Sequence, residues 1–468
     1  MKNLNNLSVT NFGPVNKAQI NISPLTVFVG KNNSGKSFLS SLIHCLSNPF
    51  PEDLRDFIDC SLRNVNSVLF EEFEKELNDY LCMKPSYEDE SFKFSFNKFL
   101  VLICDGFGKC YTELIEDNLK NTFKTDLNNL NRNKKYPFTI TYNQINFFNK
   151  NGHLCCDNLK NILSQHIRQI NRILPSGVKI SSDDDFLKIN LDYSTWMERN
   201  NILEVRSLGE EIYFFVVNEL IERLNLNSFY ISSDSDILNE LNNLLINEVN
   251  NVLTPLYIRK EFITDFLSDE SLKKGFFYNL ACEMENEIYN GEIQITNIDF
   301  KEEFVFIDNS NNLELELNLV SSSVKQLTLL IVNLKYYLNK GDFLILEEIE
   351  KHLHPENQLI LVKYLVKVLN EGLNIILTTQ SDYVLEKFNN LIELGNCEKE
   401  IFNHLDYDES CILDYNDISI YNFKKNADFS YTPDLVDINS TGFSDKVFSE
   451  VIDELYTESD IIEEYKIT

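Results

Sequence analysis

Apolar and polar positions predict buried strands and amphipathic helices in alternation at both ends of the chain. Residues 25–29 (LTVFV) form a short continuous apolar run, which is typical of a buried strand. Similar runs occur at residues 344–346 and 374–379, and between them apolar residues return every three or four positions. The residues with helical spacing are Phe38, Leu39, Leu42, Ile43 and Leu46, then Leu327, Leu330, Ile331 and Leu334, and finally Leu359, Val362, Leu365, Val366 and Leu369. This alternation indicates an α/β fold.

The residues between these two blocks carry mixed patterns. Helical spacing predicts helices over residues 237–253 and 262–289, while shorter apolar stretches predict strands at 138–142, 187–193 and 212–217. Three alternating stretches predict a meander just before Ser321; they are residues 291–297, 303–308 and 313–318. No heptad repeat continues over three or four units, so we expect a compact, mostly helical insertion with some strands.

The turn after residues 25–29 is the strongest chemical signal in the chain. It reads Gly30-Lys31-Asn32-Asn33-Ser34-Gly35-Lys36-Ser37, with every fixed position of a phosphate-binding loop between a strand and a helix. The glycines let the backbone curl until its N–H groups and the helix N-terminus hold phosphate oxygens. Lys36 would neutralise the β- and γ-phosphates, and Ser37 would bind Mg²⁺. A ligand-free Gly-rich turn is the alternative, but this setting favours binding of a nucleoside triphosphate such as ATP.

The run at residues 344–346 ends in two carboxylates, Glu347 and Glu348. At the end of a strand the first carboxylate would reach the Mg²⁺ shell, and the second would polarise the attacking water. Two solvated glutamates are the alternative, which loses force because a phosphate-binding loop requires such a partner. Upstream, Ser321 is suited to cap a helix N-terminus, and Pro355 is suited to start another. Together these features predict an ATPase.

Composition limits the classes of partner. The 468 residues are 43% hydrophobic and carry a net charge of −31, and residues 401–468 hold 16 acidic residues against 4 lysines. A protein that binds nucleic acid non-specifically concentrates Lys and Arg, and no dense basic run exists here. Nucleic-acid binding in a local basic groove stays open as an alternative, but the charge does not favour it.

Membrane and metal signals are weak. No apolar run approaches the roughly 20 residues that a membrane helix needs, and the start MKNLNNLSVT lacks the apolar stretch of a signal peptide. We therefore expect a cytoplasmic protein without a membrane segment. Ten cysteines and six histidines show none of the usual zinc spacings, which indicates ordinary reduced thiols.

The order of these motifs resembles the ABC-type ATPase head shared by SMC proteins, double-strand-break repair ATPases and the overcoming-lysogenization-defect (OLD) nucleases. The run from Asn11 through the phosphate-binding loop and the block from Ser321 to Leu385 are similar to small OLD-like ATPases of prokaryotic antiphage defence, including those of Septu and PARIS-type systems. The specific match covers roughly residues 1–48 and 290–390, about a third of the chain. The resemblance implies a P-loop ATPase head, a mixed sheet with flanking helices, that carries the insertion.

The resemblance also implies roles for individual residues. Ser321, with Ser322 beside it, would be the signature serine that reaches the γ-phosphate bound by the other head of a dimer. Glu347 would bind Mg²⁺ and Glu348 would be the catalytic base. His354 falls at the position of the D-loop aspartate, and Gln380 at that of the switch histidine. The assembly would therefore be a homodimer of heads or a higher homo-oligomer.

Three departures from the family pattern predict slow turnover. Ser322 and Ser323 stand where glycines usually allow close backbone approach to the partner's phosphate. Gln380 can hydrogen-bond a phosphate oxygen but, unlike His, cannot become cationic or transfer a proton. ATP hydrolysis is therefore expected to be slow, with ATP used as a switch.

The patterns divide the chain into four parts. Residues 1–48 are expected to be the first part of the head, and 49–289 the mostly helical insertion that contacts partners. Residues 290–400 would complete the head with signature, Walker B and switch, and 401–468 would be an acidic α/β segment packed on it. In this last part, Phe443, Val447, Phe448, Val451, Ile452 and Leu455 predict a helix.

These observations favour an ATPase subunit of an antiphage defence complex. No nuclease motif stands out after the head, so a nuclease or toxin-like effector is expected on a separate chain. A DNA-repair or recombination ATPase of the SMC type is one alternative. A nucleotide-gated scaffold with little hydrolysis is another.

Overall fold

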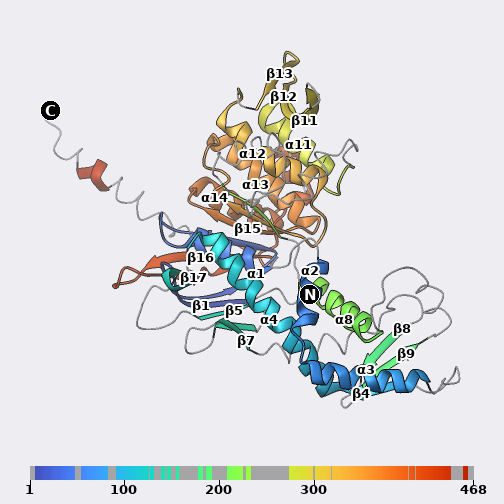
Figure 1. Ribbon diagram of the computed structural model, residues 1–468. Helices are drawn as coiled ribbons and strands as arrows, with labels where there is room; N and C mark the ends of the chain where they lie inside the picture. Colours follow the sequence, from blue (N-terminus) through green and yellow to red (C-terminus); the bar gives the residue numbers. More distant parts are fainter. Residues whose placement is uncertain are drawn as a thin grey trace, which may run out of the picture. The chain divides into compact units, whose positions relative to one another are not determined.

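The computed structural model describes residues 6–47, 54–82, 91–125, 127–130, 139–142, 145–148, 154–157, 178–182, 186–191, 208–224, 228–232, 273–298, 301–317, 319–398, 400–405, 407–443 and 457–461. The chain forms two compact units. The head unit comprises Met1–Asn5, Gly13–His44 and Asn227–Thr468, and the second unit comprises Asn6–Phe12 and Cys45–Leu226. Figure 1 labels many of the elements of both.

The head unit is built on a mixed sheet. Its strands follow the order β10 (Ser228–Ile231), β14 (Phe343–Glu347), β15 (Asn374–Thr379), β3 (Leu25–Val29), β16 (Ile418–Lys425), β17 (Tyr431–Leu435) and β2 (Val15–Asn21). Neighbours from β10 to β16 are parallel, whereas β16 and β17 are antiparallel. All residues of β3 and β10 are buried, as expected for parallel strands that are covered on both faces.

Helices flank this sheet, and their starts follow the capping signals of the sequence (Figure 1). Ser321 and Ser381 cap α12 and α14 by accepting hydrogen bonds from the N–H groups of Val324 and Val384. Pro355 occupies the first turn of α13, where its missing N–H costs nothing. The helices are α1 (Lys36–Ser47), α12 (Ser322–Tyr336), α13 (Pro355–Asn370) and α14 (Asp382–Glu393). The predicted α/β fold, a mixed sheet with flanking helices, is confirmed.

The meander predicted before Ser321 is confirmed. It consists of β11 (Gly291–Ile298), β12 (Lys301–Asp308) and β13 (Leu313–Glu316), all antiparallel. The preceding helix α11 (Tyr278–Tyr289) forms the last part of the helix predicted over 262–289, whereas residues 273–277 are described but not helical. Under these elements the Lys335 ammonium of α12 lies 2.5 Å from the Glu285 carboxylate of α11, and both side chains are only 1% exposed.

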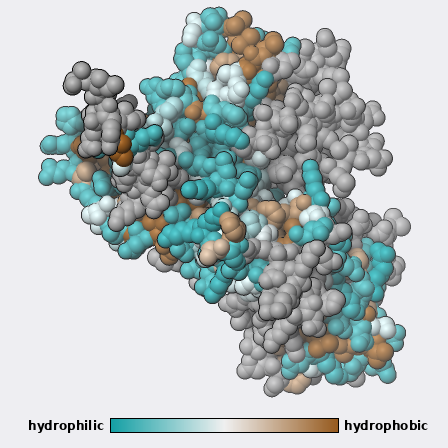
Figure 2. Space-filling model, turned by 90° about the vertical axis from the view of Figure 1, so that its left-hand side faces the viewer, coloured by the Kyte–Doolittle hydropathy of each residue, from teal (hydrophilic) through white to brown (hydrophobic). Residues whose placement is uncertain are grey.

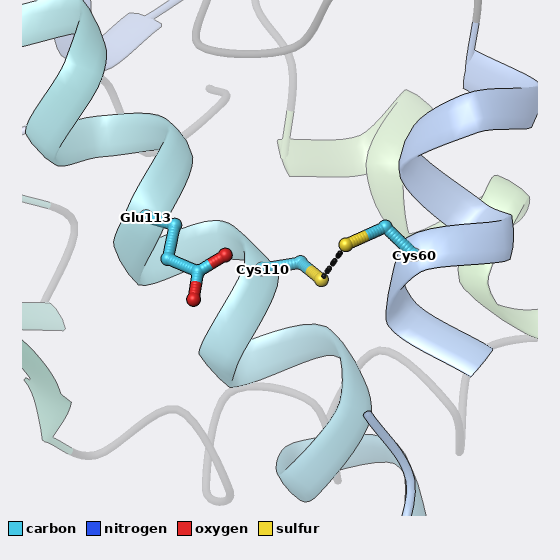
Figure 3. Close-up of side chains that lie close together, drawn as sticks. All are labelled: Cys60, Cys110 and Glu113. Atoms are coloured by element: carbon cyan, nitrogen blue, oxygen red, sulfur yellow. Dashed lines mark hydrogen bonds between the residues drawn. The ribbon is translucent and has the colours of Figure 1, made fainter. Parts of the chain in front are cut away.

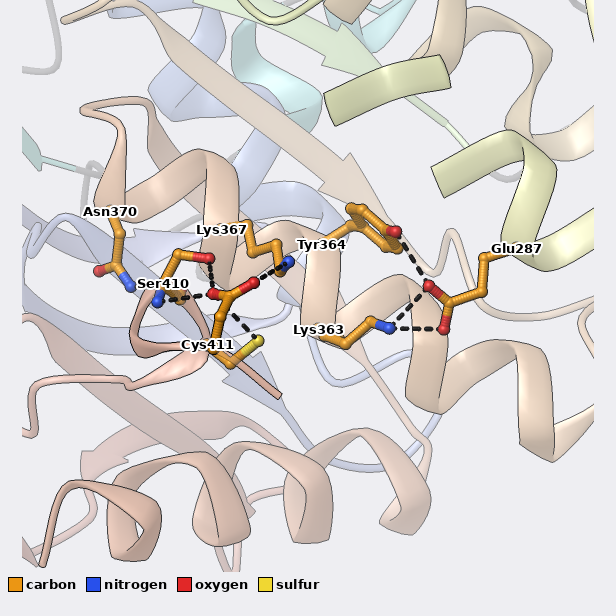
Figure 4. A network of polar contacts seen from close by, with 8 residues as sticks. Glu287, Lys363, Tyr364, Lys367, Asn370, Ser410 and Cys411 are labelled. Atoms are coloured by element: carbon orange, nitrogen blue, oxygen red, sulfur yellow. Dashed lines mark hydrogen bonds and ion pairs between the residues drawn. The ribbon is translucent and has the colours of Figure 1, made fainter. Parts of the chain in front are cut away.

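A polar network ties α13 to its neighbours (Figure 4). The Lys363 ammonium donates to the Glu287 carboxylate of α11 at 2.5 and 2.7 Å, and the Tyr364 hydroxyl donates to it at 2.9 Å. One turn further, Lys367 donates to Asp408 at 2.7 Å. These contacts connect α13 to α11 and to Asp408. The remaining short elements are η1 (Leu394–Asn396), α15 (Glu400–Leu405), η2 (Glu409–Cys411), β18 (Ile438–Asn439) and β19 (Gly442–Phe443).

Of the six residues that predict a helix after residue 442, the structure describes only one. Phe443 was included in it because of its spacing, but it lies in β19, paired with Ile438. Asn389 accepts the Phe443 N–H at 2.9 Å, so a tertiary contact decides the local structure there. The other five residues of that pattern lie outside the described residues.

The second unit combines helices with two groups of paired strands. Its helices are α2 (Leu54–Arg63), α3 (Ser67–Cys82), α4 (Phe96–Phe123), α5 (Leu127–Leu130) and α8 (Leu208–Leu224). Four of its strands follow the order β1 (Asn6–Phe12), β5 (Thr139–Tyr142), β6 (Ile145–Phe148) and β7 (Leu154–Asp157), and a three-stranded sheet has the order β4 (Phe92–Ser95), β9 (Phe186–Leu191) and β8 (Val178–Ser182). Most of the described residues of this unit are helical. Phe73 packs edge-on against Phe92 and Phe94 in its core.

One element of this unit was predicted wrongly. Residues 212–217 were predicted to be a strand, because they are rich in β-branched and aromatic residues. They lie within α8, where Ile212, Tyr213, Val216 and Val217 are buried. Burial at positions i, i+1, i+4 and i+5 marks one face of a helix, so tertiary packing overrides the local preference. The helix predicted over 237–253 lies outside the described residues.

None of the helices in the described part of the chain has both the length and the apolar character required to cross a membrane.

Candidate functional site

The loop from Gly30 to Ser37 joins β3 to α1, as the sequence predicts. Its backbone takes left-handed conformations at Gly30 (φ +142°), Asn33 (φ +61°) and Gly35 (φ +100°). A Cβ at Gly30 would lie 3.0 Å from Cβ of Phe423, and one at Gly35 would lie 2.8 Å from Val15 Cγ2. Glycine is therefore required at both positions for conformation and for space.

Lys36 lies in the centre of this loop with a buried side chain. Its ammonium donates hydrogen bonds to the carbonyls of Gly30 at 2.8 Å and Lys31 at 3.1 Å, and it lies 3.9 Å from Glu348 Oε1. Burial lowers the pKa of Lys36, and the carboxylates of Glu348, Glu350 and Glu347 oppose that shift. An anion in the loop would therefore find a cation already in place.

The loop also offers donors that suit an anion. The Ser34 hydroxyl is buried and, within the described part of the chain, has no hydrogen-bond partner. The first turn of α1 carries no acidic residue, so the positive end of the helix dipole is uncompensated there. Lys31, Asn32 and Asn33 are exposed at the rim of the loop. A buried unpaired hydroxyl beside a helix N-terminus is the arrangement expected of a phosphate site.

Strand register brings the carboxylates to the same edge of the sheet as the loop. Glu347 at the end of β14 is opposite Thr378 of β15, and Thr379 is opposite Val29 at the end of β3. Glu348 follows with φ +44°, and its N–H donates to the Thr378 carbonyl at 3.0 Å. The strained left-handed conformation turns the chain sharply as β14 ends.

Each of these carboxylates accepts a hydrogen bond from a neighbouring side chain. Gln380, which follows β15, donates a hydrogen bond to Glu348 Oε1. The Tyr230 hydroxyl of β10 donates to Glu347 Oε2 at 2.5 Å and accepts a hydrogen bond from Ser41 of α1 at 3.1 Å. Burial, with the charge of Glu347 adding to it, raises the pKa of Tyr230 well above its usual value, so the hydroxyl keeps its proton.

A second layer of polar contacts lies behind Gln380. Glu350 Oε1 accepts from the Thr379 hydroxyl at 2.5 Å and from the Gln380 N–H at 3.3 Å. Glu350 Oε2 is buried without a hydrogen-bond partner in the described structure, and burial raises the pKa of this carboxyl. Gln358 Oε1 accepts from the Ser381 hydroxyl at 2.5 Å.

Sequence reasoning missed Tyr230, Glu350 and Gln358. Glu350 left a signal, because it is the third acidic residue in the run after residues 344–346. Tyr230 left none, because β10 lies more than a hundred residues before Glu347 and meets it only through the pairing of β10 with β14.

Ser321, Ser322 and His354 lie elsewhere on the head unit. Ser321 caps α12, and its hydroxyl lies 2.8 Å from that of Ser323. His354 caps α13, where Nδ1 accepts from the Glu356 N–H at 3.4 Å. Ser321, Ser322 and His354 are exposed, and the hydrogen bonds that the described structure gives Ser321 and His354 remain within their own helix turns. The structure therefore brings Lys36, Glu347, Glu348 and Gln380 together, but not these three residues.

Two apolar side chains are exposed in the segment that precedes α12. Leu319 is 70% exposed and Leu313 of β13 is 49% exposed. Figure 2 shows hydrophobic residues gathered at the top of the molecule, at the level where Figure 1 places the meander β11–β13. Exposed apolar groups of this kind mark surfaces that pack against other chains.

Ser37 and Glu347 supply hydroxyl and carboxylate oxygens, the hard ligands that Mg²⁺ prefers. Ser37 is in the first turn of α1, and Glu347 is close enough to Lys36 to affect its pKa. This donor set fits a magnesium ion shared with phosphates, and it offers no soft ligand for a transition metal.

Comparison with known proteins gives a family and weak structural similarities. The model of the AAA ATPase domain matches residues 1–385. No curated protein matches the chain. A solved Smc head domain with an extended coiled coil, bound to the C-terminal domain of ScpA derived from Pyrococcus furiosus, is 13% identical, with 96% of this chain and 98% of that one covered and a TM-score of 0.37. The SMC head domain from Thermotoga maritima is 11% identical, with 94% and 100% covered and a TM-score of 0.33.

Proposed function

The chain belongs to the AAA ATPase domain family, and we propose that it is the ATPase subunit of an antiphage defence complex. Two heads pair around ATP, and binding and slow hydrolysis of ATP control a separate effector chain, a nuclease or toxin-like protein, in the cytoplasm. The arrangement of Lys36, Glu348 and Gln380 carries the enzymatic part of this proposal. The resemblance to OLD-like defence ATPases supports the biological part.

At the loop, the backbone N–H groups, the Ser34 hydroxyl and the Lys36 ammonium hold the phosphates of ATP. Lys36 exchanges its present carbonyl acceptors, Gly30 and Lys31, for phosphate oxygens. Ser37 and Glu347 hold Mg²⁺, which when bound neutralises charge on the β- and γ-phosphates. The Lys36 ammonium then faces the negative charge of the phosphates as well as that of Glu348. Nucleotide binding therefore favours the charged form of Lys36.

Glu348 is the general base that orients and polarises the attacking water. Its Oε1 now faces both Gln380 and the Lys36 ammonium. Once phosphate engages Lys36, the Glu348 carboxylate is available to the attacking water. Gln380 keeps the carboxylate aimed through its hydrogen bond and can contact the γ-phosphate through the same amide.

The exposed signature residues complete the site in trans. Ser321, Ser322 and His354 lie on helix N-termini with free surface around them, and Leu319 is exposed two residues away. A second head that packs against this surface would place the Ser321 hydroxyl and the positive end of α12 against its own γ-phosphate. This supports a homodimer of heads, or a larger homo-oligomer that contains such pairs.

A nucleotide-gated scaffold is the second candidate. The contact of Gln380 with Glu348 favours it, because an amide cannot take up or pass on a proton as imidazole does. The ATPase and the scaffold differ only in the rate of ATP hydrolysis.

Steady-state ATP hydrolysis with Mg²⁺ tests the enzymatic part. Lys36→Ala should lose nucleotide binding, and Glu348→Gln should bind ATP but turn it over at least about a hundredfold more slowly. Lys340→Ala is the control, because this exposed lysine precedes β14 at the opposite edge of the sheet. ATP binding without turnover in the wild type would establish the scaffold instead.

Plating of phages on cells that carry the gene with its neighbours tests the biological part. Protection that is lost in Lys36→Ala and Glu348→Gln, but kept in Lys340→Ala, is expected. Equal plating with and without the intact gene, across a diverse phage panel, would contradict the defence role without affecting the ATPase assignment.

A further inference from the structure

Two thiols meet where α2 and α4 cross in the second unit (Figure 3). A Cβ on Gly106 of α4 would lie 2.4 Å from the Ser61 carbonyl of α2, so only glycine permits so close a crossing. Cys110 lies one helical turn after Gly106, and Cys60 immediately precedes Ser61. The close crossing therefore directs the two side chains toward each other.

The thiols and a carboxylate form a compact cluster. Cys110 Sγ lies 2.9 Å from Cys60 Sγ. Glu113 is three residues after Cys110, on the same face of α4, and one ligand atom from each of the three residues lies within 4.8 Å of the others. Two sulfurs and one oxygen are thus presented to a common point from two helices.

A side-chain amide donates hydrogen bonds to both sulfurs. The Asn64 side-chain amide donates to Cys110 Sγ at 3.4 Å and to Cys60 Sγ at 3.6 Å. The Lys109 ammonium donates to the Asn64 carbonyl at 3.2 Å and adds a positive charge nearby. Donors aimed at thiolates are the usual outer shell of a cysteine metal site.

We propose that Cys60, Cys110 and Glu113 bind a thiophilic divalent cation of the Zn²⁺ type. Thiolates select Zn²⁺ over the hard ions Mg²⁺ and Ca²⁺. With Zn–S bonds of about 2.3 Å in a tetrahedral site, the sulfurs must be roughly 3.8 Å apart, so ion binding rotates the thiols outward by about 1 Å. Cys60 is half-buried and Glu113 is exposed, which leaves an open side for entry and for water as fourth ligand.

A reversible disulfide is the competing use of the same pair. A disulfide would use only the two sulfurs and would leave Glu113 without a role. A cation uses one ligand atom from each of the three residues. The geometry of the cluster therefore fits a metal ion better than a redox pair.

Zinc titration of the reduced, metal-free full-length protein against a chromophoric chelator tests the proposal. The wild type should bind one Zn²⁺ more than either Cys60→Ser or Cys110→Ser, and Glu113→Gln should weaken that site about tenfold or more. Cys397→Ser, which removes an exposed thiol of the head unit, should leave the stoichiometry unchanged. Equal binding by the wild type and both cysteine variants would overturn the proposal.

Alkylation of the wild type gives a second readout that does not depend on the folding of variants. Zinc should slow iodoacetamide labelling of Cys60, followed by peptide mass, at least about tenfold. Unchanged labelling with saturating Zn²⁺ would overturn the site. So would recovery of a Cys60–Cys110 disulfide from protein that takes up no zinc after reduction.

Discussion

The Tyr230 hydroxyl joins Glu347 of β14 to Ser41 of α1 through hydrogen bonds of 2.5 and 3.1 Å. One phenol thereby connects the proposed magnesium carboxylate to the helix that follows the phosphate loop. Tyr230→Phe removes both hydrogen bonds and keeps the ring. Outer-shell partners of this kind typically contribute about tenfold to metal affinity.

For Tyr230→Phe we therefore predict that the Mg²⁺ concentration for half-maximal ATPase activity rises about tenfold. The KM for ATP at saturating Mg²⁺ should change less. Tyr415→Phe, at an exposed tyrosine, is the control. An unchanged Mg²⁺ dependence in Tyr230→Phe would show that the hydroxyl does not position Glu347.

Glu350 accepts two hydrogen bonds through Oε1, one from the last residue of β15 and one from the residue after it. Glu350→Ala leaves the Thr379 hydroxyl and the Gln380 N–H without this acceptor, at a cost of about 1–3 kcal/mol in the free energy of unfolding. The rate of ATP turnover should fall as well, because the Gln380 N–H loses its hydrogen-bond acceptor. Glu350→Gln keeps an acceptor oxygen and removes a buried charge, so its stability in urea and its kcat should stay close to wild type. Equal losses in both variants would indicate that the charge itself is required.

The buried pair of Glu285 and Lys335 predicts a pH dependence of stability. Burial raises the pKa of Glu285 to about 7, although the Lys335 ammonium pulls it down. The folded state thus binds more protons than the unfolded state between about pH 4.5 and 7, so stability falls as pH rises through this window, by up to about 3 kcal/mol.

Urea unfolding at pH 5, 6, 7 and 8 measures this dependence. The double variant Glu285→Gln/Lys335→Met removes both charges and should show a flatter profile than the wild type. Lys335→Met alone leaves the carboxylate buried without its cation and should destabilise by about 3–5 kcal/mol at pH 8. Parallel profiles of wild type and double variant would exclude Glu285 as the titrating group.

Head pairing predicts complementation between inactive subunits. Lys36→Ala disables the site that binds ATP, whereas Ser321→Arg disables the surface presented to the partner. In an equal mixture, half of the dimers are mixed and each has one intact composite site, so about a quarter of wild-type activity should return. Each variant alone should be inactive. A mixture as inactive as its components would argue that Ser321 acts within its own head, or not at all.

Local sequence was enough to predict the elements whose interacting residues are neighbours in the chain. Gly30 and Gly35 specify the loop because φ and space exclude side chains there. The cap at Ser321, the helix start at Pro355 and the meander from 291 to 316 are encoded by residues that are close together in the chain. The strand runs before Gly30 and Glu347 are apolar on both faces, which predicts burial without knowledge of the partners.

Only the tertiary structure decided which distant groups share a site. Tyr230 reaches Glu347 because β10 pairs with β14, and Glu350 reaches Gln380 because β14 pairs with β15. Cys60 and Cys110 meet because Gly106 lets two helices cross closely, which their spacing of fifty residues does not reveal. Residues 212–217 became helical because a buried helix face outweighed their β-forming side chains. Sequence patterns report contacts within one helix or strand. Strand register and helix crossings depend on packing between two elements, and the sequence of one element specifies that packing only in part.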